Sequence, residues 1–420
     1  GARGANGVIL VTTKSAKEGK ISVKYSGYVQ MKKVAETLDV LDAQDYVFNQ
    51  WAYATAYNAT MGNAIGEYFG LGSANGNHYA EYADMRSHDY TDDLLRTTYS
   101  QNHSLSVSGG SDKTKVILSV NYMKDKGIRM NSGYSRWNAS VKVQQEIAKN
   151  LKLNFDARYY EVGLEGKNDL DMISTAFRYK PIDNPLGNGD YGGFGVGSVN
   201  VEDTSNPVLQ LNDYVRDNKR YGLRAQTSLA WEIIKGLTVT TDLGLGRSWN
   251  DNKDFQYGLT TKSGKPYAKW EKKDGWNVRS ATTVNWQVQG LGDDHSLSFL
   301  AGNEVLANNN SSTTIEGAGY PASYGPDKVF GMINMTDPIL GLDAFKSNVG
   351  IPEKTVSFFG RVNYSYKGRY LFTATFRSDG SSKFAPNNRW GYFPAAAFGW
   401  RISEESSMEG TRDWLDNLKL

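Results

Sequence analysis

Residues 221–231 read Tyr-Gly-Leu-Arg-Ala-Gln-Thr-Ser-Leu-Ala-Trp and alternate between two kinds of side chain. Leu223 and Leu229 fall on one side of this alternation, whereas Arg224 and Ser228 fall on the other. A period of two is typical of a β-strand whose two faces meet different environments. We therefore predict a strand with one apolar face and one polar face.

The same pattern recurs through most of the chain, and little of the sequence shows helical spacing. Each predicted strand has about 10–13 residues, and a tilted strand needs about 9–11 residues to cross a bilayer. The predicted fold class is therefore all-β. The twelve predicted strands are 21–32, 100–109, 114–123, 134–145, 151–161, 219–231, 237–249, 277–289, 295–306, 354–366, 369–378 and 391–403.

The connections between these strands alternate in length. Tight turns are predicted at Gly110–Lys113, Glu232–Gly236 and Lys367–Gly368. The intervening connections are longer, and the long loops are 33–99, 162–218, 250–276 and 307–353. Outer-membrane barrels have short turns on the periplasmic side and long loops outside the cell. The alternation favours a transmembrane antiparallel β-barrel over a soluble sandwich.

The side chains agree with a barrel. Aromatic residues gather near the strand ends, where interfacial girdles lie. They are Tyr122, Trp137, Tyr159, Tyr160, Tyr221, Trp231, Trp249, Tyr366, Tyr370, Tyr392 and Trp400. We expect Leu153, Phe155, Leu223, Leu229, Val284 and Phe372 to face lipid, and Asn154, Arg224, Asn285 and Thr373 to face the lumen.

Composition excludes several other classes. The 420 residues carry a net charge of +2, which gives no basic excess for a nucleic-acid partner. The absence of cysteine excludes disulfides, thiolate metal sites and cysteine nucleophiles. Mean hydropathy is −0.53, and no apolar run approaches the roughly 20 residues of a membrane-spanning helix. A barrel is compatible with this polarity because only alternate residues face lipid.

Both ends of the chain carry the motifs of one family. The first is Gly1-Ala-Arg-Gly-Ala-Asn-Gly-Val-Ile-Leu-Val-Thr-Thr-Lys14, and Leu38–Tyr46 follows it. Near the other end stand Arg377-Ser-Asp-Gly-Ser-Ser-Lys-Phe384, Asn388-Arg-Trp-Gly-Tyr-Phe-Pro-Ala395, Gly399-Trp-Arg-Ile-Ser-Glu-Glu405 and Trp414-Leu-Asp-Asn-Leu-Lys-Leu420. These stretches resemble the SusC/RagA-like TonB-dependent transporters of the Bacteroidetes outer membrane.

The resemblance implies a plugged barrel of about 22 strands, of which about 12 lie in this chain. Residues 1–14 would be the C-terminal end of the plug domain, and residues 15–420 the N-terminal part of the barrel. The implied activity is TonB-dependent import of a nutrient, an oligosaccharide in our first interpretation and a peptide in the second. The implied partners are a SusD-like lipoprotein, the TonB–ExbB–ExbD complex and outer-membrane lipid. The implied location is the cell outer membrane.

The glycines of the first motif do not form a phosphate-binding loop. Gly1, Gly4 and Gly7 have the spacing G-x-x-G-x-x-G, and an apolar strand follows them instead of a helix. We interpret Gly1, Arg3, Gly4, Asn6 and Gly7 as the junction between plug and barrel, where glycine permits tight turns.

Loop 33–99 is unusual because it holds ten acidic and three basic residues together with many aromatic ones. We predict a helix over Ala43–Asn58. The aromatic residues would build a core for the loop, or they would form a surface that binds a sugar, a peptide or a partner protein. The candidate contact residues are Trp51, Tyr53, Tyr57, Tyr79 and Tyr82.

No cofactor, metal site or catalytic set is predicted. His78 and His88 are too far apart in sequence to impose a metal site, and 379–382 resembles only part of a calcium loop. Two alternatives to active import remain. One is a passive porin or adhesin barrel, and the other is a barrel lipase that would pair a serine with His103 or His295.

The number of strands also predicts whether the sheet closes into a barrel. Twelve strands cut from a larger barrel would leave two open edges, at 21–32 and 391–403, and unpaired backbone groups are costly in lipid. We expect a curved open sheet, and not a closed twelve-stranded barrel.

Overall fold

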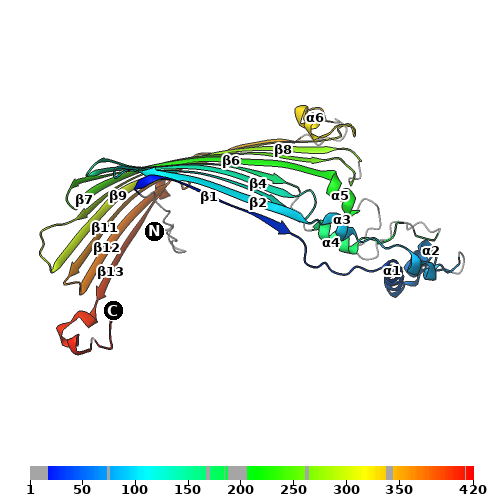
Figure 1. Ribbon diagram of the computed structural model, residues 1–420, viewed down its shortest axis with the longest axis horizontal. Coiled ribbons are helices and arrows are strands. Elements are labelled where there is room, and N and C mark those ends of the chain that lie inside the picture. The colour runs from blue at the N-terminus through cyan, green and yellow to red at the C-terminus, as the bar shows by residue number, and fades with distance from the viewer. Residues whose placement is uncertain are drawn as a thin grey trace.

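We describe a computed structural model of the chain, over residues 18–72, 76–166, 171–183, 185–187, 206–260, 264–336, 344–411 and 413–420. It is built around one curved antiparallel sheet with helices beyond one end (Figure 1). Among the described residues, no helix has the length and apolar character needed to cross a membrane.

The sheet is an up-and-down meander in which each strand pairs with its neighbours in sequence. The one departure is β10, which pairs only with β9, so that β9 and β11 are also neighbours. The strands are β1 (Gly19–Lys32), β2 (Thr98–Gly110), β3 (Thr114–Lys126), β4 (Gly133–Ala148), β5 (Leu151–Glu165), β6 (Tyr214–Ile234), β7 (Leu237–Gln256), β8 (Tyr267–Gln287), β9 (His295–Ala318), β10 (Ala344–Val349), β11 (Glu353–Tyr366), β12 (Tyr370–Ser381) and β13 (Trp390–Trp400).

All twelve predicted strands are present, and two predicted loops are wrong in part. Most of 250–276 continues β7 and β8, and the connection between them is only 257–266. Within 307–353, β9 runs on to Ala318, and β10 pairs with that extension. The extended ends carry polar residues on both faces, so the alternation that identifies a strand in lipid is absent there.

The tight turns lie where they were predicted. Between β11 and β12, Lys367 and Gly368 both have positive φ, at 53° and 63°, and the Arg369 amide donates to the Tyr366 carbonyl at 2.9 Å. Two consecutive positive φ values are the mark of the type I′ turn, whose twist suits a hairpin. Glycine removes the steric cost at the second position.

The helices lie in the long connections. The first contains α1 (Ala43–Tyr57), α2 (Ala59–Tyr68), η2 (Tyr79–Asp84) and α3 (Tyr90–Leu94). The β5–β6 connection contains α4 (Asp171–Arg178) and α5 (Pro207–Asp213), and the β9–β11 connection contains α6 (Pro326–Gly331). The predicted helix over Ala43–Asn58 is confirmed: the Asp42 carboxylate caps its start, and Asn58 ends it and caps α2.

The sheet is open, as expected. The path of paired strands runs from β1 to β13 without joining them, and β1 pairs with β2 alone in the described chain. The end of β13 differs from expectation because Leu420 exchanges backbone hydrogen bonds with Trp400, at 2.9 and 2.8 Å. The 3₁₀-helix η4 (Pro386–Asn388) precedes β13, and η5 (Ile402–Glu404) and η6 (Ser406–Thr411) lie between Trp400 and Leu420.

Candidate functional site

The two faces of the sheet have different chemistry, because residues paired across antiparallel strands share a face. Leu153 pairs with Leu229, and Val239 pairs with Val284. Large side chains of this apolar face, including Leu223, Leu229, Val284 and Phe372, remain 38–47% exposed. The side chains predicted to face lipid therefore share one face of the sheet.

The polar face is made by the alternate residues. Asn154 pairs with Ser228, Asn285 pairs with Thr238, and the Thr373 hydroxyl donates to Asn363 Oδ1 at 3.1 Å. Two grooves lie on this face, lined by residues such as Arg158 and Arg224. The predicted division of these residues between two faces is confirmed.

Aromatic rows mark both edges of the apolar face. Near the loop end, Tyr122 pairs with Trp137, and Tyr221 stacks on Trp249 with ring centroids 5.6 Å apart. Trp231 lies ten residues beyond Tyr221 on β6. At about 3.3 Å per residue and a tilt of about 40°, that separation is about 25 Å, the height of the apolar band of an outer-membrane barrel.

One groove on the polar face is basic. It has a volume of about 760 Å³, and β4, β5 and β6 provide most of its walls. The arginines that line it are Arg136, Arg158, Arg220 and Arg224, and all four are exposed.

The ion pairs of this groove are unequal. Arg158 is held by Asp156 through two hydrogen bonds of 2.7 and 3.0 Å. Arg136 donates to Asn138 Oδ1 at 2.9 Å and lies 5.7 Å from the ring centre of Tyr160. In the described chain, Arg220 and Arg224 make no ion pair or side-chain hydrogen bond. The groove therefore offers guanidinium groups that are free to bind an anion.

Elsewhere on the same face, two arginines share a carboxylate. Glu304, with its side chain 13% exposed, accepts from Arg279 Nε at 2.8 Å and lies 3.6 Å from Arg377 Nη2. Arg377 also donates to Asp379 at 2.8 Å and to Ser357 at 3.0 Å. Asp379, part of the fragment that resembled a calcium loop, is thus an ion-pair partner. No cluster of metal-ligating side chains occurs in the ranges described above.

Beyond the loop end of the sheet, two long loops fold into one body (Figure 1). A first apolar cluster joins Tyr46, Val47 and Phe69 of the first loop to Ile182 of the β5–β6 connection. A second cluster joins Tyr90 and Leu94 of the first loop to other residues of that connection, namely Met172, Ala176, Tyr179 and Leu211. We call 33–97 and the described part of 166–213 the loop body.

The predicted contact residues occupy different places in the loop body. Tyr53 and Tyr57 are 56% and 71% exposed, whereas Trp51 is 37% exposed, and Tyr79 packs near Phe48 with ring centroids 6.3 Å apart. Tyr82 is buried in the first cluster.

Two hydrogen bonds hold the buried Tyr82. Its hydroxyl donates to the Phe69 carbonyl at 3.0 Å and accepts from the Leu186 amide at 2.8 Å. Burial raises the pKa of the Tyr82 phenol. Tyr82 therefore serves the loop core, while the other four residues lie nearer the surface. The junction residues Gly1, Arg3, Gly4, Asn6 and Gly7 lie outside the described residues.

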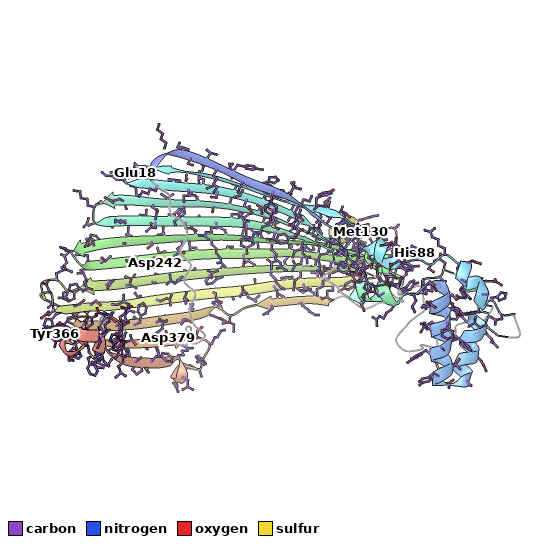
Figure 2. All side chains as sticks on the ribbon, turned by 60° about the horizontal axis from the view of Figure 1, so that its bottom comes forward. Glu18, His88, Met130, Asp242, Tyr366 and Asp379 are labelled. Carbon is purple, nitrogen blue, oxygen red and sulfur yellow. The ribbon has the colours of Figure 1, made fainter. Side chains whose placement is uncertain are left out.

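The histidines are held by other side chains. Tyr25 and Tyr364 lie 2.7 and 2.8 Å from the Nδ1 atoms of His103 and His295. No serine hydroxyl hydrogen-bonds to either ring in the part of the chain described here. His88 lies 2.5 Å from an Asp93 carboxylate oxygen, at the junction of the loop body and the sheet, and Tyr366 lies at the opposite, turn end (Figure 2).

No protein-family model matches the chain. Among curated proteins, it is 29% identical over 441 residues to TonB-dependent receptor P3 of Formosa agariphila, covering 97% of this chain and 38% of that protein. It is also 29% identical over 455 residues to TonB-dependent receptor SusC of Bacteroides thetaiotaomicron, covering 100% of this chain and 41% of that protein. The chain thus spans about two fifths of the length of these relatives.

The fold is similar to that of the RagAB transporter. The RagAB peptide importer in its open-open state superposes with a TM-score of 0.76 at 18% identity, over 100% of this chain and 48% of that one. A second structure, of the RagAB peptide transporter, gives 0.72 at 15% identity. The resemblance to SusC/RagA-like TonB-dependent transporters is confirmed along the whole chain, and these relatives are named as receptors and transporters, not enzymes.

Proposed function

We propose that this chain forms part of a TonB-dependent outer-membrane transporter that imports a nutrient oligosaccharide, with a peptide as the second substrate class. The observation that carries the proposal is the sheet itself. One face is apolar between two aromatic rows, the other is polar and grooved, and long loops gather at one end. The similarity to TonB-dependent receptors over the whole chain supports it.

This arrangement supports import from the loop end towards the turn end. The loop body would lie outside the cell and receive the substrate, and Trp51, Tyr53, Tyr57 and Tyr79 would contact it there. A SusD-like lipoprotein would cover the same end, and TonB–ExbB–ExbD would supply energy from the turn end through the plug. Residues 1–14 would end that plug, with Gly1–Gly7 at its junction with the barrel.

Uptake measurements test this function. Cells that carry the whole protein are given labelled oligosaccharides or peptides, with and without an uncoupler of the inner-membrane proton gradient. Active import predicts uptake that the uncoupler or deletion of TonB abolishes. Uptake that continues at the same rate without energy would contradict the proposal and favour the passive porin alternative.

A further inference from the structure

The basic groove between β4 and β6 contains an unusual cross-strand pair of arginines. Arg158 on β5 and Arg224 on β6 are directly paired residues, so two like charges face one another on the same side of the sheet. Directly opposed like charges destabilise an antiparallel pair, and Asp156 provides one negative charge for two guanidinium groups. The pairing costs stability that a negatively charged ligand would recover.

The excess of positive charge extends along the same groove. Arg220 lies four residues before Arg224 on β6, and it lines the groove beside Arg136. Asp156 is the only acidic residue among the described residues that line the groove. In the β8–β12 region, by contrast, Glu304 and Asp379 neutralise Arg279 and Arg377. The excess of positive charge is therefore larger in this groove than around Glu304.

An aromatic ring lies within the groove. Tyr160 lies opposite Gly222, and a Cβ at Gly222 would stand 2.3 Å from the Tyr160 ring. Glycine therefore lets the ring lie against the β6 backbone. The Tyr160 side chain is half-buried there, beside the Arg136 guanidinium group. An aromatic ring beside guanidinium groups suits a sugar ring that carries a negative substituent. The ring provides apolar contact, and the guanidinium groups bind carboxylate or sulfate oxygens in pairs.

We propose that this groove is a binding site for an acidic oligosaccharide, with Arg220 and Arg224 as the residues that select its carboxylate or sulfate groups. The site rests on the proposed transport function, since the groove lies on the lumen face towards the loop end. It narrows the substrate from nutrient oligosaccharides in general to anionic ones. Asp156 holds Arg158 opposite Arg224, and Tyr160 supports the sugar ring.

Binding to the purified whole protein tests the site without requiring transport. The probes are an oligogalacturonate and a maltooligosaccharide of equal length, together with oligoglutamate as an acidic peptide. The variant Arg220→Gln/Arg224→Gln removes the two unpaired charges. The control, Lys152→Gln, removes an exposed charge from the same face of β5 outside the groove.

We expect the wild type to prefer the oligogalacturonate, with an affinity that falls as salt rises. The double variant should lose at least about tenfold of that affinity, because charge-assisted hydrogen bonds are lost. Lys152→Gln should keep it, and Arg224→Lys in the Arg220→Gln background should restore part of it because the charge returns.

Three results would overturn the site. One is equal binding of the neutral and acidic saccharides, and another is a preference for oligoglutamate. The third is unchanged affinity in a double variant that folds normally. If uptake did not depend on energy but binding still preferred the anionic saccharide, the proposed active import would be contradicted and the proposed binding site would still stand.

Discussion

The two faces of strands β5–β8 alternate along the same backbone, yet they follow different rules. The apolar face carries aliphatic side chains through its middle, with Leu153 beside Leu229 and Val239 beside Val284 in adjacent strands. The polar face changes along the sheet, from unpaired arginines in β6 to the ion pairs of Glu304 in β9. Contact with lipid requires only that side chains be apolar, whereas a polar lumen can carry charged side chains at particular positions that bind a ligand.

The largest expected effect comes from placing a charge on the apolar face. Leu229→Arg in the whole protein should reduce assembly, because arginine on the lipid face costs about 2–4 kcal/mol at mid-bilayer and less towards the aromatic row, which Trp231 marks two residues away. Ser228→Arg, one residue away on the polar face, should assemble normally. The measurement is the amount of folded protein in isolated outer membranes. Normal assembly of Leu229→Arg together with loss of Ser228→Arg would reverse the assignment of the faces.

The two ends of the sheet give the next contrast. An epitope tag in loop 33–97 should be labelled on intact cells, because the long loops are expected outside. Tags at Lys235 or Gly292, in the turns that follow β6 and β8, should be labelled only after the membrane is permeabilised. Labelling of either turn on intact cells would invert the orientation.

A smaller effect is expected from two glycines in adjacent strands. A Cβ at Gly302, on the polar face, would stand 2.7 Å from the Thr282 carbonyl oxygen and 2.8 Å from the Phe359 ring. At Gly360, on the apolar face, the Cβ would meet Leu300 at an ordinary 3.6 Å. We expect Gly302→Ala to cost about 1–3 kcal/mol through overpacking and Gly360→Ala to cost much less. Denaturant titration of folded protein measures both, and equal costs would show that the faces are packed alike.

The smallest effect concerns the loop body, where Tyr82→Phe would leave the Leu186 amide without its acceptor. We expect a local loss of about 1–3 kcal/mol, read as faster amide exchange around Phe69 and Leu186, with no loss of barrel assembly. Tyr53→Phe, at an exposed position, is the control and should change nothing.

The same tyrosine gives a pH dependence. Burial raises the pKa of the Tyr82 phenol, so its contribution to stability is complete below about pH 10 and is lost as pH rises through the folded pKa. After division by the intrinsic base-catalysed rate, amide exchange around Leu186 should therefore increase above pH 10 in wild type, and this extra increase should be absent in Tyr82→Phe. An identical alkaline response in both proteins would contradict this role for Tyr82.

The strands were predictable because lipid imposes a period of two on them, and residues 221–231 show it without any knowledge of their neighbours. The prediction was wrong beyond the upper aromatic row. Past the aromatic row at the loop end, β7 continues through Asn250 and Asp251. A strand that extends beyond the lipid does not need an apolar face, so the period of two is lost. The predicted helix over Ala43–Asn58 was correct, since Asp42 and Asn58 are good caps.

The sites were less predictable, because they depend on partners far apart in sequence. Ile182 and Leu186 complete the core around Tyr82, and nothing in the sequence shows that the two loops pack together. Arg224 was predicted to face the lumen, but its position opposite Arg158 follows only from the strand register. The signal that could have revealed the groove is a pair of like charges on the polar faces of two neighbouring predicted strands.

The most direct test of the two-faced sheet is a cysteine scan along residues 222–231, in a background from which any cysteine outside these 420 residues has been removed, since the 420 residues contain none. Each single variant of the whole protein is spin-labelled in lipid vesicles, and its accessibility to oxygen is compared with its accessibility to a water-soluble nickel complex. We predict strict alternation, with positions 223, 225, 227 and 229 reached by oxygen and positions 224, 226 and 228 reached by nickel. Accessibility to nickel at every position, or a helical period of 3.6, would contradict the account.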